Sequence, residues 1–239
     1  MLRRLPTALA AAFLFLAPTV SQANLAIYGQ SFEGLVQADP AALANDGWLV
    51  FGNVFSPDHS VYYYGYGPFP APNGGPGFCA IANGQGGPLQ GAQQLVVYSD
   101  YNNGDHNNGN LIEANVFHEQ TIGAADVGST WTFSFDAKHG DLVSPSTALA
   151  FIKTLAPPTY AMTNFLTVDM TSIPTTWGLY WISIPITGSL VGQILQFGFA
   201  NTTTHYVPSG VFYDNVNFRP DLATPVTPKT WGNLKALYR

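Results

Sequence analysis

A period-two alternation of apolar and polar side chains dominates the second half of the chain. It is clearest at residues 131–138, where Trp131, Phe133 and Phe135 are separated by Thr and Ser. This period places one face of an extended segment in a core and the other in water, so it predicts a half-buried β-strand. Six further runs predict strands: residues 94–98, 148–153, 164–168, 180–186, 194–200 and 211–218.

These predicted strands are short and are separated by segments rich in Gly, Pro, Asn and Thr. No long helical periodicity lies between them, which disfavours parallel β-α-β topology. The pattern therefore predicts an all-β protein, an antiparallel β-sandwich of the jelly-roll type with long loops. We expect about eight to ten strands in it.

Two short helices are predicted outside the strand runs. Asp39 and Pro40 precede an alanine-rich segment and are suited to the cap and first position of a helix. At the C-terminus, an extended linker precedes a segment that places Trp231, Leu234 and Tyr238 on one helical face. This tail is expected either to dock on the domain or to act as a sorting or attachment signal, and self-assembly through it is a further alternative.

The N-terminus has the pattern of a secretory signal peptide. Arg3 and Arg4 precede the apolar run 8–18, and Ala23 lies at the expected cleavage point. We therefore predict a signal peptide at 1–23, a β-sandwich domain at 24–220 and a linker with an amphipathic tail at 221–239. The expected location is extracellular, at the cell surface or in the periplasm, and no later segment is a candidate membrane span.

Composition indicates that the domain is stabilised by its core. Cys79 is the only cysteine, so no intramolecular disulfide can form. Apolar residues make up 46% of the chain and aromatic residues 14%, which is enough for a large core.

The charge pattern narrows the range of partners. The chain has a formal net charge of −6, and loss of Arg3 and Arg4 with the signal peptide would make it −8. No Lys or Arg occurs between Asn24 and Ala137. Such a surface cannot neutralise phosphates or anionic lipids, which argues against nucleic acid and membrane surfaces as partners. Neutral polysaccharide, cell-surface glycan and divalent cations remain.

Three short motifs resemble a known family. They are Ser31–Gly34, Asp46–Trp48 and the closing segment 211–216. In this order they resemble the xylanase-associated (family 4/9) carbohydrate-binding modules, which are galactose-binding-like jelly rolls. The resemblance implies a non-catalytic module for neutral carbohydrate. It also implies a structural calcium ion that joins the first and last strands at Glu33 and Asp214.

The residues around Asp214 allow two interpretations. A period of two places its carboxylate on the same face as Phe212, Val216 and Phe218, where an unpaired charge is costly. A hard cation would remove that cost. The alternative is a strand end in water, or backbone hydrogen bonds to the carboxylate. The segment Asp100–Asn110 also allows two interpretations, a second cation site or a solvated Asn/Gly turn.

The segment from Val61 to Gln94 is expected to be a long decorated loop region with few strands. It holds the densest aromatic group of the chain, whose rings could stack on sugars. The alternative is that alternate tyrosines pack inward, and Trp48 is assigned to the core. The candidate ligand-binding residues are Tyr62, Tyr63, Tyr64, Tyr66 and Phe69.

The sequence contains no catalytic motif. Glu113, Glu119, Asp136 and Asp141 cannot be paired from the sequence, and a surface ion pair with Lys138 would account for Asp136. We therefore predict a binding protein without enzyme activity. A surface or matrix assembly protein is the alternative, and a glycan hydrolase or lyase would require two acids that converge in a cleft.

Overall fold

The computed structural model describes residues 24–221, which form twelve strands and one short α-helix. The helix is α1 (Ala42–Asn45), and three short 3-10 helices lie at Gly104–Asn108, Ala124–Asp126 and Gly188–Leu190. The strands are β1 (Tyr28–Gln30), β2 (Leu49–Phe55), β3 (Tyr62–Pro70), β4 (Cys79–Asn83), β5 (Gln93–Val97), β6 (Leu111–Thr121), β7 (Thr130–His139), β8 (Thr147–Ala156), β9 (Ala161–Asp169), β10 (Gly178–Pro185), β11 (Ile194–Thr203) and β12 (Val211–Pro220).

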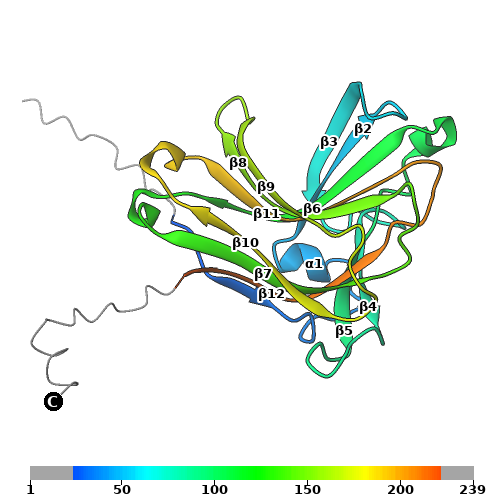
Figure 1. Cartoon of the computed structure of the whole chain (residues 1–239), viewed down its shortest axis with the longest axis horizontal. Helices are drawn as coiled ribbons and strands as arrows, with labels where there is room; N and C mark the ends of the chain where they lie inside the picture. Colours follow the sequence, from blue (N-terminus) through cyan, green and yellow to red (C-terminus); the bar gives the residue numbers. More distant parts are fainter. Residues whose placement is uncertain (1–23, 222–239) are drawn as a thin grey trace, which may run out of the picture.

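Two antiparallel sheets pack face to face (Figure 1). Sheet A has the order β10-β7-β12-β5-β4, and β1 pairs with β12 beside it. Sheet B has the order β3-β2-β6-β11-β8-β9. The predicted all-β antiparallel sandwich is therefore confirmed.

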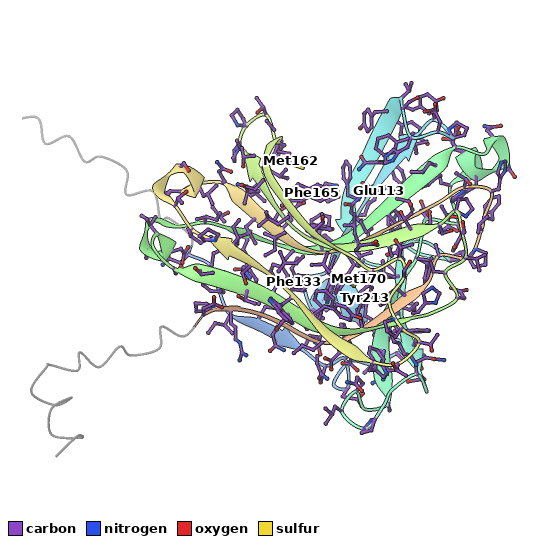
Figure 2. All side chains as sticks on the ribbon, in the orientation of Figure 1. Glu113, Phe133, Met162, Phe165, Met170 and Tyr213 are labelled. Atoms are coloured by element: carbon purple, nitrogen blue, oxygen red, sulfur yellow. The ribbon has the colours of Figure 1, made fainter. Side chains whose placement is uncertain are left out.

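The core lies between the two sheets and is built from aromatic rings. Phe199 of sheet B stacks on Tyr213 of sheet A with ring centroids 3.6 Å apart. Phe133 of sheet A contacts Phe197 and Phe199, and Figure 2 shows Phe133 and Tyr213 between the sheets. Trp48 is fully buried, as predicted. Ring-to-ring packing of this density can stabilise the domain without a disulfide.

The predicted strand count was too low, and the segment 61–94 is not a long loop. β3 and β4 both fall inside it, and β2 and β6 were also missed. β3 has no alternation because it is an edge strand whose first three tyrosines are all exposed. β6 has no polar face because Asn115 and Phe117 are buried on the side opposite the core. A strand covered on both faces does not show the period-two pattern.

The helix predicted after Asp39 is present and begins at Ala42. The Asp39 carboxylate accepts a hydrogen bond from the Ala41 backbone N–H, so the acidic residue acts just ahead of the first turn. The proposed signal peptide and C-terminal helix lie outside the described residues. Among residues 24–221, no helix is long and apolar enough to cross a membrane.

Gly198 of β11 is required for the close approach of β11 to β6. A Cβ on Gly198 would overlap the Val116 carbonyl oxygen and lie 2.7 Å from the Phe117 Cα. Both atoms belong to backbone that cannot move without separating the strands. We therefore expect Gly198→Ala to lower the free energy of unfolding by about 3 kcal/mol, measured by denaturant titration.

Gly188→Ala is the matched control for this substitution, because a Cβ there has no heavy atom within 4 Å. Its expected effect is within about 0.5 kcal/mol. Equal denaturation midpoints for the two variants would show that the strand contact at Gly198 is not tight.

Candidate functional site

The outer face of sheet B carries a cleft of about 770 Å³. In Figure 1 the β2–β3 pair and the β8–β9 pair rise on either side of β6 and β11. Figure 2 shows Met162 and Phe165 on the β8–β9 side and Glu113 of β6 toward the β2–β3 side. The cleft is lined by residues of β2, β3, β6, β8, β9 and β11 and of the β8–β9 turn: Phe51, Asn53, Gly67, Pro68, Asn115, Phe117, Glu119, Lys153, Leu155, Tyr160, Met162, Ile194 and Gln196.

The floor of the cleft is apolar. Phe117, Gly198 and Phe151 lie side by side on neighbouring strands. Both rings are buried, and with Ala200 and Phe51 they form a small cluster separate from the main core. The missing side chain at Gly198 leaves room for the Phe117 Cβ. These buried rings form an aromatic layer beneath the more accessible side chains of the cleft.

Lys153 lies over this aromatic layer, next to Phe151 and Phe165. Its Nζ is 4.2 Å from the centroid of the Phe151 ring and 5.1 Å from that of Phe165. It donates a hydrogen bond of 2.5 Å to the Asn115 side-chain oxygen. Burial lowers the pKa of Lys153, and the nearby Glu113 charge acts in the opposite direction. An ammonium group is thus held in an apolar surround, where its remaining hydrogens can bind a ligand oxygen.

Glu113 fixes the amides next to this lysine. Its carboxylate accepts hydrogen bonds of 2.8 Å from the Asn53 and Asn115 side chains. Asn115 in turn accepts from Lys153, so a polar line crosses β2, β6 and β8. The line holds each amide in one orientation, and pre-oriented polar groups are what give a binding cleft its specificity.

The acids of the cleft are far apart. Glu113 and Glu119 lie on the same strand, six residues from each other, which is about 20 Å along an extended chain. Glu119 accepts a hydrogen bond from Gln196 at the far end of the cleft. Two-carboxylate glycoside hydrolysis requires a separation of about 5–10 Å, so these two acids do not form such a pair.

The tyrosines predicted to bind ligand do not all face this cleft. Tyr64 and Tyr66 lie opposite Val54 and Gly52 of β2, on the side of sheet B that faces sheet A. Their hydroxyl groups donate to Asp105 and Asp100.

Tyr62 lies on the cleft side of β3. A Cβ on Gly65 would meet both the Tyr62 hydroxyl group and the Phe51 ring. The Tyr62 hydroxyl group is therefore near Phe51, which lines the cleft. Tyr63 and Phe69 are exposed. Asn115 and Lys153 were missed because nothing in the sequence indicates that their strands are neighbours of β2 and β11.

Asp214 lies where three strands meet. β12 pairs with β5 up to Tyr213 and with β1 from Val216, and a bulge separates the two segments. Asp214 shares a face with Phe212, but Val216 and Phe218 point into the core with Tyr213. The predicted common face of Asp214, Val216 and Phe218 was therefore wrong, because the bulge reverses the alternation.

The environment of Asp214 is unfavourable for a bare carboxylate. The residue is fully buried, and its Oδ2 has no hydrogen-bond partner among the described residues. Burial, with smaller contributions from the charges of Glu33 and Asp136, raises the pKa of Asp214 to about 7. Glu33 reaches this region from the segment after β1 and accepts hydrogen bonds from the Ala92 and Gln93 N–H groups.

These residues fit a hard cation only in part. A positive ion would stabilise the orphaned Asp214 oxygen and the neighbouring Glu33 charge. Within residues 24–221, however, no three His, Cys, Asp or Glu side chains converge on a metal-sized site. A cation here would therefore need backbone carbonyl or amide oxygens in addition to the two carboxylates.

The acids of the loop at 100–110 are engaged within the protein. Asp100 accepts from Tyr66, and Asp105 accepts from Tyr64 and Asn110. The predicted ion pair between Asp136 and Lys138 is replaced by other contacts. Lys138 donates to Gln85, and Asp136 accepts from Gln90 and Asn215.

No protein-family model matches the sequence, and no curated protein matches it either. Several solved structures are similar in fold. The C-terminal family 22 carbohydrate binding module of Clostridium thermocellum Xyn10B matches with 14% identity and a TM-score of 0.41, covering 81% of this chain and 91% of that one. The Stig cyclase Fisc from Fischerella sp. TAU matches with 14% identity and a TM-score of 0.45, covering 82% and 98%.

The enzymatically active domain of bacteriophage CBA120 tailspike protein 4 also matches, with 12% identity and a TM-score of 0.44. The match covers 78% of this chain and 21% of the tailspike chain, so the protein spans about a fifth of that length. Carbohydrate-binding modules of β-sandwich structure are thus among the solved structures to which this chain is similar. At these identities the likeness concerns the fold alone.

Proposed function

We propose that this protein is an extracellular, non-catalytic module that binds neutral carbohydrate in the cleft of sheet B. The observation that carries the proposal is the arrangement of Lys153 and Asn115 beside the accessible rings of Phe51, Tyr160 and Phe165. Sugars have apolar faces that stack on aromatic rings and hydroxyl groups that pair with fixed donors and acceptors. A cleft of about 770 Å³ is large enough for a short oligosaccharide.

The charge of the domain supports a neutral ligand. Residues 24–221 contain fourteen acidic side chains and only three basic ones, which are Lys138, Lys153 and Arg219. Glu113 and Glu119 flank the single ammonium group of the cleft. A polyanion would be repelled by this surface, whereas sugar hydroxyls can pair with both the carboxylates and the ammonium. The extracellular location rests on the pattern at 1–23, which lies outside the described residues.

A calcium ion at Glu33 and Asp214 is the second part of the proposal. The ion would neutralise the buried Asp214 carboxylate of β12, the last strand of the domain. It would thereby link β12 to Glu33, which lies just after β1, the first strand. The role is structural, because the bulge of β12 lies in sheet A, whereas the cleft is on the outer face of sheet B.

Binding to a panel of insoluble neutral polysaccharides tests the cleft. The mature chain is expected to bind at least one of them, and Phe165→Ala is expected to weaken that binding about tenfold by removing the ring beside Lys153. Affinity electrophoresis in soluble polymer gives the same comparison quantitatively.

Trp181→Ala is the matched control, because Trp181 is a more exposed aromatic side chain on the opposite sheet. This variant is expected to bind like the parent. Absence of binding to every neutral polymer would contradict the proposed function. Loss of binding in Trp181→Ala, with Phe165→Ala unaffected, would move the site to sheet A.

A further inference from the structure

The outer face of sheet A has an exposed apolar surface next to the point where the described chain ends. Trp181 is 61% exposed and Leu179 is 64% exposed, and both line a depression of about 690 Å³. Asp221 lines the same depression. Its N–H donates to the Thr130 carbonyl, and its carboxylate accepts a hydrogen bond from the Thr132 hydroxyl. The start of the C-terminal tail is thereby fixed at the edge of this surface.

The tail has the composition that such a surface would bind. Residues 222–239 contain Lys229, Lys235 and Arg239 and no acidic side chain, which gives a formal charge of +3. Residues 24–221 have a formal charge of −11, from fourteen acidic and three basic side chains. Asp136 and Asp221 both line the depression, with Arg219 as its one cation. The tail and the domain are therefore complementary in charge.

The predicted apolar face of the tail matches the exposed side chains in size and reach. Trp181 is four residues along β10 from Pro185, which pairs with Thr130, and β10 lies two strands from β12, so Trp181 is about 16 Å from the tail's origin. The proline-containing linker 222–229 can extend about 25 Å. The helix that the sequence predicts over 230–239 would be about 15 Å long and would present Trp231, Leu234 and Tyr238 together.

We propose that residues 222–239 dock on the outer face of sheet A of the same molecule, with the apolar face of the tail covering Trp181 and Leu179. Because the tail is tethered at Asp221, its local concentration at this surface is in the millimolar range, so a weak contact is sufficient. This inference is independent of the proposed carbohydrate binding. Exchange of tails between two molecules would instead produce the self-assembly considered for this segment.

Disulfide trapping in the full mature chain tests the docking. Cys79 is buried, and burial raises the pKa of its thiol, so the single native cysteine does not compete. The test variant carries Ser183→Cys, beside Trp181 on the same face of β10, together with Leu234→Cys. Under oxidised glutathione, the intramolecular disulfide is expected to form at least about tenfold faster than in the control pair.

The control pair is Thr187→Cys with Leu234→Cys. Ser183 and Thr187 are both exposed and lie two residues on either side of Pro185, so the tether reaches them equally well. Adding Trp181→Ala to the test pair should lower its rate of intramolecular disulfide formation to that of the control pair. Equal rates in the two pairs would overturn the proposal. Disulfides found mainly between two molecules would also overturn the proposal, because they would assign the tail to a second copy. Glycan binding that depends on Trp181 would overturn it as well, because the ligand and not the tail would then occupy this surface.

Discussion

Replacing Lys153 with methionine is expected to weaken carbohydrate binding by about 10- to 100-fold. Methionine preserves the length and the apolar stem of the side chain but removes the ammonium group that lies between Phe151 and Phe165. A hydrogen bond to a charged group contributes about 1.5–3 kcal/mol, and 1.4 kcal/mol corresponds to a factor of ten in affinity. Isothermal titration calorimetry with the polymer retained in the binding panel measures the change.

Lys138→Met is the matched control for this substitution. Lys138 also lies over two aromatic rings, those of Trp177 and Phe212, but it belongs to sheet A. Its loss is expected to leave binding unchanged, and both variants should keep the parent far-UV circular dichroism spectrum. If Lys153→Met binds as tightly as the parent, the ammonium group does not contact the ligand.

The pH dependence of binding provides an independent check on Lys153. Burial lowers its pKa from the usual lysine value, so the ammonium loses its proton at a lower pH than an exposed lysine would. As the pH is raised, affinity for the polymer is therefore expected to fall at a pH below that at which ordinary lysines lose their proton. Lys153→Met should show no such decline.

Calcium is expected to raise the melting temperature of the mature protein by about 5–10 °C at pH 8. Without a cation, the folded state keeps a buried carboxylate at Asp214 next to the charges of Glu33 and Asp136. At one hundred times its dissociation constant, a bound ion adds about 2.7 kcal/mol, and each kcal/mol shifts the midpoint of a domain of this size by about 2–4 °C. Differential scanning calorimetry with calcium and with chelator makes the comparison.

The pH dependence in chelator has a definite sign. The pKa of Asp214 is about 7 in the folded protein and 3.8 in the reference state. Between these values the folded state holds a proton that the unfolded state has lost, so stability falls as pH rises from about 4 to 7. The full cost, on the order of 4 kcal/mol, is present above pH 7. Below pH 4 both states are protonated and the contribution disappears.

Asp214→Asn should abolish both the calcium response and this pH-dependent loss, because it removes the ionisable group. Asp169→Asn changes an exposed acid on β9 and serves as the control, for which the calcium response is expected to persist. An unchanged melting temperature in calcium and chelator, with no metal bound, would remove calcium from the proposal while leaving the cleft untouched.

Asp214 also illustrates the limit of reading faces from a sequence. The segment 211–218 has a regular alternation, and period two placed Asp214 with Val216 and Phe218. The bulge that reverses this face forms because β12 changes partner from β5 to β1 at this point. A change of partner is a property of the sheet, so no local pattern reports it.

The tyrosine-rich strand shows a second limit. Its aromatic content was visible in the sequence, but β3 is an edge strand that places Tyr62 near the cleft and Tyr66 on the opposite side. The side chains that converge at the cleft are those of Asn53, Asn115 and Lys153, and no sequence pattern indicated any of them. They come from β2, β6 and β8, which are brought together only by the order of strands in sheet B.

By itself the sequence determined that this protein is an all-β sandwich with an aromatic core and a surface poor in cations. Period-two alternation and charge are local or additive quantities, so they can be read directly from the order of residues. Tertiary structure decided where the cleft lies, which ammonium group it holds and which carboxylate is left buried without a partner. Those features depend on contacts between strands that are distant in sequence, and such contacts exist only once the two sheets have packed.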